Sequence, residues 1–139
     1  MNANDAELVR VTTRRQGGSV FDRNPILGTS GNFAGFEVAV EGEAGDVLGD
    51  SGARYELRIE AFDITSGTNP HNESNQFTQS VQQSFSAADG WPRMVKVFPV
   101  ALNDVLAVRG HLLKYYASIS GEGWEVFSCV ESLPFILHQ

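Results

Sequence analysis

The chain contains 139 residues with a mass of 15.1 kDa, a size that predicts one domain spanning residues 1–139. Its hydrophobic share of 42% and charged share of 19% are those of a globular domain rather than a disordered segment. Ten Lys and Arg against seventeen Asp and Glu give a net charge of −7, which argues against binding to the phosphates of nucleic acids.

The cysteine content and the N-terminus predict where the protein works. The single Cys129 cannot form an intramolecular disulfide, and this is typical of a reducing compartment. Residues 1–7 have neither a basic start nor an apolar stretch, so they do not resemble a signal peptide. No apolar run approaches the ~20 residues that cross a bilayer. We therefore expect a soluble, cytoplasmic, acidic protein that does not contact membranes.

The first half of the chain alternates apolar and polar residues with a period of two, which is typical of strands that bury one face. The alternation is clearest over residues 54–62 and recurs over residues 36–41 and 8–15. On a helix the same spacing would scatter the charges around the whole circumference. The arginines at 14–15 predict that the first of these strands lies at an exposed sheet edge, where charge discourages pairing with another molecule.

Residues 76–88 fit two kinds of secondary structure. Phe77, Val81 and Phe85 recur every four residues, as in a short helix, but they also share one face of a strand. The intervening Gln and Ser residues are indifferent helix formers, and the Asp-Gly pair at 89–90 is typical of a hairpin turn. We therefore predict a strand here, with a short helix as the alternative.

The second half continues with apolar runs separated by turns. Strands are predicted over residues 94–100, 105–119 and 124–133. Gly110 interrupts the second of these runs and indicates a bulge or a bend. The tail from residue 134 to 139 is apolar enough to pack against the body of the domain.

About seven strands separated by Gly- and Asn-rich turns predict an all-β fold, a single-domain, two-sheet antiparallel β-sandwich. Residues 112–117, with the sequence Leu-Leu-Lys-Tyr-Tyr-Ala, resemble the penultimate strand of immunoglobulin-like domains, and the predicted strand order resembles theirs in architecture. The paired cysteines of antibody domains are absent, because the chain has one cysteine. The alternatives are a closed β-barrel and a sandwich with one short helix at 76–88.

An acidic, glycine-rich stretch over residues 41–52 is the most informative candidate for a binding site. Proteins present oxygen ligands to calcium on such loops, although the spacing here does not match an EF-hand. If the strands alternate in direction, this loop shares one end of the domain with the turns at 89–91 and 121–124. That end then holds the predicted ligand-binding residues: Glu43, Asp46, Asp50, Asp89, Glu122, Trp91 and Trp124.

Such an end fits a calcium ion, a cationic group or a sugar stacked on an indole ring. The alternative interpretation is that the carboxylates are solvated turn residues and that both tryptophans fill the core. No cofactor other than calcium is predicted, because the chain contains no glycine-rich phosphate loop and no metal-binding motif.

Three functions remain open, and we favour the first. In it the chain is a non-enzymatic module that acts by protein binding or assembly, with a partner or with itself, through loops or an exposed sheet edge. In the second it binds calcium or carbohydrate at the acidic end. In the third it is an enzyme whose site is assembled only in three dimensions. Catalysis has little local support, since we expect His111 to be a hydrogen-bonded strand residue and Cys129 to be buried.

Overall fold

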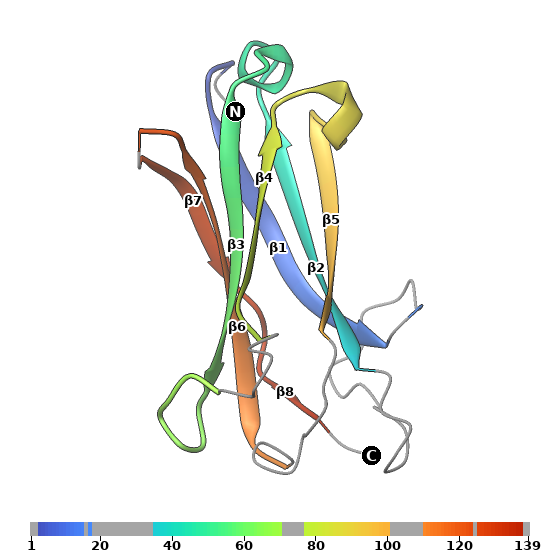
Figure 1. The fold of residues 1–139 in the computed structure, drawn as a ribbon, viewed down its shortest axis with the longest axis vertical. Helices are drawn as coiled ribbons and strands as arrows, with labels where there is room; N and C mark the ends of the chain where they lie inside the picture. The colour runs from blue at the N-terminus through green and yellow to red at the C-terminus, as the bar shows by residue number, and fades with distance from the viewer. Residues whose placement is uncertain are drawn as a thin grey trace.

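The computed structural model describes residues 3–15, 17, 35–70, 77–100, 110–123 and 125–137. The fold is a β-sandwich of two antiparallel sheets that pack together and do not close into a barrel (Figure 1). The described strands are β1 (Ala6–Arg15), β2 (Phe36–Ala44), β3 (Arg54–Asp63), β4 (Gln79–Ser84), β5 (Arg93–Val100), β6 (Leu112–Gly121), β7 (Val126–Glu131) and β8 (Phe135–Ile136). Two short 3-10 helices, η1 (Leu48–Asp50) and η2 (Ala87–Asp89), lie in the connections. No helix of these ranges is long and apolar enough to cross a membrane.

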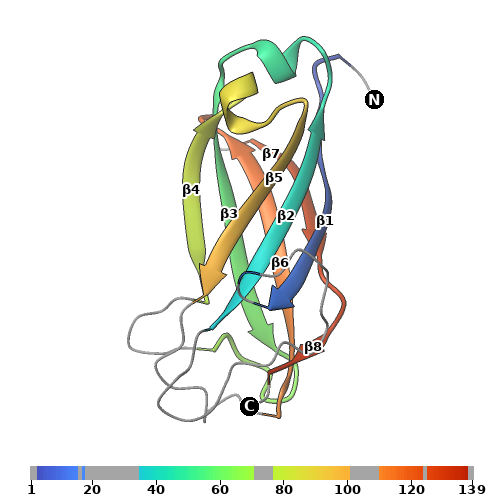
Figure 2. The same cartoon turned by 90° about the vertical axis from the view of Figure 1, so that its right-hand side faces the viewer.

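One sheet has the strand order β1-β2-β5 and the other the order β4-β3-β6-β7, with β8 added beside β6. Figure 2 shows the first sheet from its outer side, with β4 at the margin of the sheet behind it. All pairs are antiparallel. The chain crosses from one sheet to the other after β2, after β4 and after β5, so each sheet combines strands that are distant in sequence.

The alternation of apolar and polar residues explains which face of each strand is buried. In β3 the side chains of Tyr55, Leu57 and Ile59 face the other sheet and are buried, while Arg54 and Arg58 face water. This confirms the predicted period of two. The core between the sheets is rich in aromatic residues, and its largest fully buried rings are Tyr55, Tyr115, Phe36, Phe77, Phe85 and Phe135.

The segment that fitted both a strand and a helix is a strand. β4 pairs with β3 in regular register, and Val81 lies opposite Leu57. Phe77 and Phe85 at the two ends of β4 are fully buried, so tertiary packing explains their spacing without a helix. The helix alternative for 76–88 is therefore wrong, apart from the single turn of η2.

The hairpin predicted at residues 89–90 is also wrong. β4 pairs with β3 in one sheet, whereas β5 pairs with β2 in the other, so this connection passes between the sheets. The chain turns through η2 and then Gly90, whose φ of 95° is in the left-handed region that favours glycine. The Asp-Gly pair therefore marks a tight turn, but the strands on either side of it do not pair with each other.

The C-terminal part agrees with the prediction in outline. β6 begins at Leu112, after Gly110, and residues 105–109 of the strand predicted over 105–119 lie outside the described residues. β6 and β7 form the predicted hairpin. Phe135 and Leu137 are fully buried, which confirms that the tail packs against the body of the domain.

Candidate functional site

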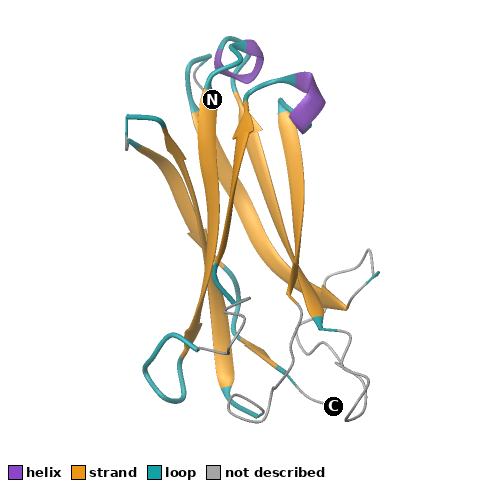
Figure 3. Ribbon diagram, in the orientation of Figure 1, coloured by secondary structure: helices purple, strands orange, loops and turns teal. Residues whose placement is uncertain are grey.

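The three loops that the sequence placed at one end of the sandwich do lie at one end. Figure 3 shows η1 and η2 there, together with the hairpin between β6 and β7. We call this the acidic end, because eight carboxylates gather there against the two arginines Arg54 and Arg93. These acidic residues are Asp5, Glu7, Glu43, Asp46, Asp50, Asp89, Glu122 and Glu125. Most of the chain's net negative charge is therefore concentrated at one end of the molecule.

The described members of the predicted ligand-binding set lie in different surroundings. Glu43 and Asp46 line a hollow of about 320 Å³ beside Arg93, on the three-stranded sheet. Glu122 lines a different hollow of about 200 Å³ on the other sheet, and its carboxylate lies 3.9 Å from Nε of Arg54. Stacked sheets lie ~10 Å apart, which separates side chains on their outer faces. Within the described ranges, no three His, Cys, Asp or Glu residues are arranged to hold a metal ion.

Trp91 is part of the core rather than a binding platform. Its side chain is buried, and its indole Nε1 donates a hydrogen bond to the Tyr55 hydroxyl at 2.9 Å. Its ring packs against Phe85 at a centroid distance of 4.9 Å and meets Tyr55 edge to face. The alternative interpretation from the sequence therefore holds for Trp91. Trp124, the second predicted platform, lies outside the described residues.

Asp89 serves its own turn. Its Oδ2 accepts hydrogen bonds from the backbone N–H of Ser84 at 2.8 Å and from the Ser84 hydroxyl at 3.2 Å. Burial raises the pKa of Tyr55 to about 12; the negative charge of Asp89 adds to this rise, and the hydrogen bond from Trp91 opposes it. Because of its two bonds to Ser84, the carboxylate of Asp89 is occupied within the chain. Asp50 on η1, by contrast, is exposed.

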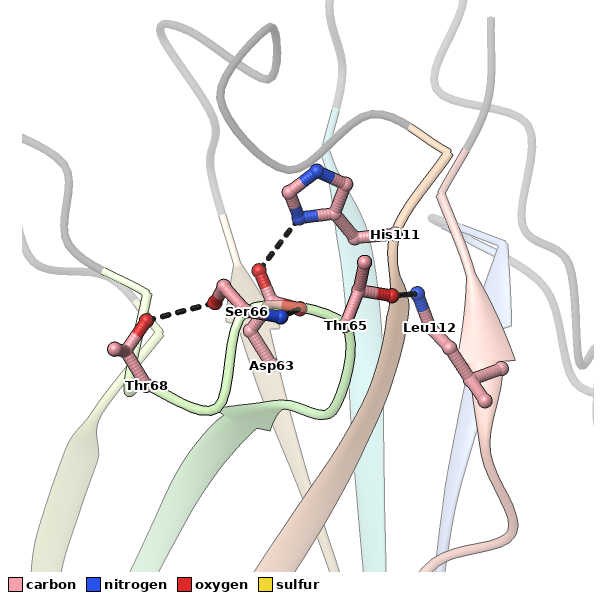
Figure 4. A network of polar contacts seen from close by, with 6 residues as sticks. All are labelled: Asp63, Thr65, Ser66, Thr68, His111 and Leu112. Carbon is pink, nitrogen blue, oxygen red and sulfur yellow. Dashed lines mark hydrogen bonds and ion pairs between the residues drawn. The ribbon is translucent and has the colours of Figure 1, made fainter.

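A polar network that the sequence did not predict lies at the opposite end of the sandwich (Figure 4). Nδ1 of His111 is 2.7 Å from Oδ2 of Asp63, whose side chain is only 3% exposed. Oδ1 of Asp63 accepts a hydrogen bond from the N–H of Ser66 at 3.2 Å. Burial pushes the pKa of Asp63 upward, but the hydrogen bonds from His111 and Ser66 outweigh it, and the net pKa is lowered. The carboxylate is therefore held in its charged form.

The same network ties the turn after β3 to the beginning of β6. The N–H of Leu112 donates to Oγ1 of Thr65, and its C=O accepts from the N–H of Ile64, both at 2.8 Å. The Ser66 hydroxyl bonds to Thr68 and not to the imidazole of His111. The far nitrogen of that imidazole points away from Asp63 (Figure 4). His111 is thus a hydrogen-bonded residue at the start of a strand, as the sequence analysis expected.

Cys129 is exposed, and the expectation that it would be buried is wrong. It lies opposite Ser118 in the β6–β7 pair, on the outer face of the sheet, where Arg58, Glu60 and Tyr116 surround a hollow of about 80 Å³. Phe127, two residues earlier, would share the face of Cys129 in a regular strand, but it lies at the register shift of β7 and packs against the core instead.

The strand edges are a further place where this sandwich can offer unpaired polar groups. Edge strands expose N–H and C=O groups that can pair with another chain. Two of the four edges, those of β1 and β7, face each other, and the N–H of Leu8 donates to Oγ of Ser128 at 3.0 Å. Both strands also contain a register shift. Neither edge is therefore a regular, open ladder.

The edge of β5 is blocked in its second half. The N–H of Ala44 donates to the C=O of Pro92. The backbone N–H and C=O groups of even-numbered residues of β5 therefore point toward β2, and those of odd-numbered residues, Pro99 included, point away from the sheet. Pro99 has no N–H, and its C=O accepts a hydrogen bond from Nε2 of Gln79 at 2.8 Å. Lys96 lies on the core-facing side of this edge strand, an arrangement that discourages pairing with another molecule.

The edge of β4 lacks such protection. The N–H of Phe85 donates to the C=O of Ala53. The backbone groups of odd-numbered residues of β4 therefore point toward β3, whereas those of Ser80 and Gln82 point outward. The strand has no proline, no charged residue and no register shift. Ser80 and Gln82 are exposed, and no described residue bonds to their outward-facing backbone groups. This edge is therefore open to another strand.

No family model matches the chain, and no match to a curated protein reaches significance.

Proposed function

We propose that the protein is a non-enzymatic binding module that takes up a β-strand of another polypeptide at the free edge of β4. The observation that carries this proposal is the pair of outward-facing, unpaired backbone positions at Ser80 and Gln82 in a regular, uncharged strand. Backbone hydrogen bonds to an added strand supply the affinity in this mode of recognition, and alternate side chains supply the specificity.

The surroundings of β4 favour a polar, uncharged partner strand. Residues 74–88 contain no charged side chain, although 19% of the whole chain is charged. Gln82 also lines the hollow of about 200 Å³ on the outer face, beside Arg54 and Glu56. A side chain of the added strand has room there, next to charges of both signs.

Strand addition is better supported than the two other functions. Calcium or carbohydrate binding depends on residues such as Glu43 and Glu122, which line separate hollows, and on Trp91, which is in the core. An enzymatic role draws on the Asp63–His111 pair, but the nearby Ser66 hydroxyl is bonded elsewhere.

The test is a selection of random nine-residue peptides displayed on phage against the wild-type protein and Ser80→Pro. The N–H of Ser80 faces outward, so proline blocks the added strand without removing a bond to β3. Val95→Pro on the outward-facing edge of β5 is the matched control. We expect enriched peptides that bind wild type and Val95→Pro but lose binding to Ser80→Pro. If no enriched peptide is sensitive to Ser80→Pro, the proposal is wrong.

We also propose that the architecture is immunoglobulin-like and that the protein works in a reducing compartment, the cytoplasm. The first, second and fifth strands share one sheet, and the third, sixth and seventh share the other, as in immunoglobulin domains. The fourth strand here lies beside the third. An exposed, unpaired Cys129 fits a compartment that keeps thiols reduced.

A further inference from the structure

We infer that the strand added at β4 is β4 of a second copy of this chain, paired antiparallel about a two-fold axis at Val81. This inference rests on the proposed function and names its partner. The two copies then join their larger sheets into one continuous sheet, in the order β7-β6-β3-β4-β4-β3-β6-β7.

The direction of the backbone groups fits this register. With Val81 opposite its own copy, Ser80 lies opposite Gln82 of the second molecule, and the two positions with outward-facing N–H and C=O groups meet. In an antiparallel pair such residues exchange both of their hydrogen bonds. Moving the axis by one residue, to Gln82, would place Ser80 opposite Ser84, whose N–H is already bonded to Asp89. The capped Ser84 therefore disfavours the neighbouring register.

The side chains agree with the same register. Val81 is a core-facing residue at the margin of the sheet, only partly buried although it packs against the core. A second Val81 directly opposite covers it, because side chains in non-hydrogen-bonded pairs are close together. On the outer face the hydroxyl of Ser80 meets the amide of Gln82, and each group can both donate and accept.

The charge distribution is compatible with a second copy in this orientation. Two molecules with a net charge of −7 repel each other unless their charged regions are kept apart. β4 carries no charge, so no like charges meet along the new ladder. Antiparallel pairing directs the two acidic ends in opposite directions, which separates most of the negative charge of one copy from that of the other.

The first test is analytical ultracentrifugation of the wild-type chain from about 10 µM to about 1 mM, the range in which interfaces with few contacts dissociate. We expect a monomer–dimer equilibrium that weakens at least about tenfold in Ser80→Pro and in Ser80→Lys. Val95→Pro and Ser118→Lys, which place the same residues away from this edge, should dimerise like wild type. A wild-type chain that stays monomeric throughout this range overturns the inference.

The second test examines the register by cross-linking. We expect Val81→Cys, in a Cys129→Ser background, to form a disulfide-linked dimer under mild oxidation, because the two Cβ atoms lie about 5 Å apart in this register. Cys129→Ser alone and Ser120→Cys in the same background should not form this dimer. A dimer that is sensitive to Ser80→Pro but does not cross-link through position 81 overturns the register.

The two proposals fail in distinguishable ways. If the chain is monomeric but phage-selected peptides bind in a manner that depends on Ser80, strand addition at β4 stands and the second copy is excluded as the partner. If neither dimers nor peptides sensitive to Ser80→Pro are found, both the proposed function and this inference are wrong.

Discussion

Asp63 is the residue whose environment departs most from what its position in the sequence indicates. It continues the core-facing series of β3 and places a carboxylate at a site where the preceding residues of that series are apolar. The cost of burying it is offset by the hydrogen bonds from His111 and from the N–H of Ser66. Extending the alternation of 55, 57, 59 and 61 by one step would have flagged this residue, but nothing in the sequence identifies His111 as its partner.

We predict that Asp63→Asn lowers the free energy of unfolding by about 1.5–3 kcal/mol at neutral pH, because a buried charge-assisted hydrogen bond is lost. The lowered pKa of Asp63 fixes the sign of the pH dependence. Its contribution is present above the ordinary value of 3.8 and is lost as the pH falls through the lower, folded-state pKa. When the free energy of unfolding is measured with urea from about pH 7 to about pH 3, the values for wild type and Asp63→Asn should therefore converge toward the acidic end.

The control for this measurement is Asp50→Asn, which removes an exposed carboxylate from η1. We expect its free energy of unfolding to follow that of the wild type at each pH. A difference between Asp63→Asn and wild type that stays constant down to the lowest pH would contradict the argument.

Tyr55 is a second buried residue whose polar group depends on hydrogen bonds within the core. Tyr55→Phe leaves the indole N–H of Trp91 buried without its acceptor, and it also removes the bond to Gln83. We expect a loss of about 1–3 kcal/mol in the free energy of unfolding at neutral pH. Because the pKa of Tyr55 is raised to about 12, its contribution is present below pH 10 and is lost between 10 and about 12. The wild-type and variant curves should converge there. Tyr116→Phe, on the outer face, should leave the stability near that of wild type.

At the level of elements, strand content could be predicted from the sequence, but of the strand pairings only the β6–β7 hairpin could. The period of two placed β3 within a residue of its observed ends, because burial on one face imposes that period. The turn at 89–90 was misinterpreted because an Asp-Gly pair reports local backbone geometry only. Whether the next strand joins the same sheet depends on distant strands, here β2 for β5 and β3 for β4.

For the candidate site, too, the sequence predicted part of the arrangement and missed the rest. The sequence correctly collected the acidic loops at one end, since loops of alternating strands share an end. It could not show that Trp91 turns inward to Tyr55, that Asp89 binds Ser84, or that Glu43 and Glu122 lie in different hollows. The open edge of β4 was also hidden, because an edge strand and a central strand differ in their neighbours and not in their own composition.

For the whole molecule, the uneven charge distribution leads to a test of the calcium alternative. Divalent cations screen carboxylates that do not converge on one point, and such carboxylates do not select one cation over another. We therefore expect calcium and magnesium at equal millimolar concentration to raise the midpoint of thermal unfolding, measured by circular dichroism, by the same small amount. An ion that binds specifically, at ~100 times its dissociation constant, would add about 2.7 kcal/mol to the free energy of unfolding and raise the midpoint much further. A shift of that size with calcium only, lost in Asp46→Asn, would contradict this prediction.

The sheet edges differ in whether they can accept another strand, and this difference limits how many copies can associate through their strands. Among the longer strands that the structure describes, β4 has the open edge, while Pro99 and Lys96 guard β5 and the strands β1 and β7 face each other. A two-fold pair uses the open edge of both copies, so no site is left for a third molecule. A chain with a second open edge would instead add copies without limit and grow into fibres. In the dimer that we infer, the guarded edges would make the assembly self-terminating, and opening one of them should lower the concentration at which the protein precipitates.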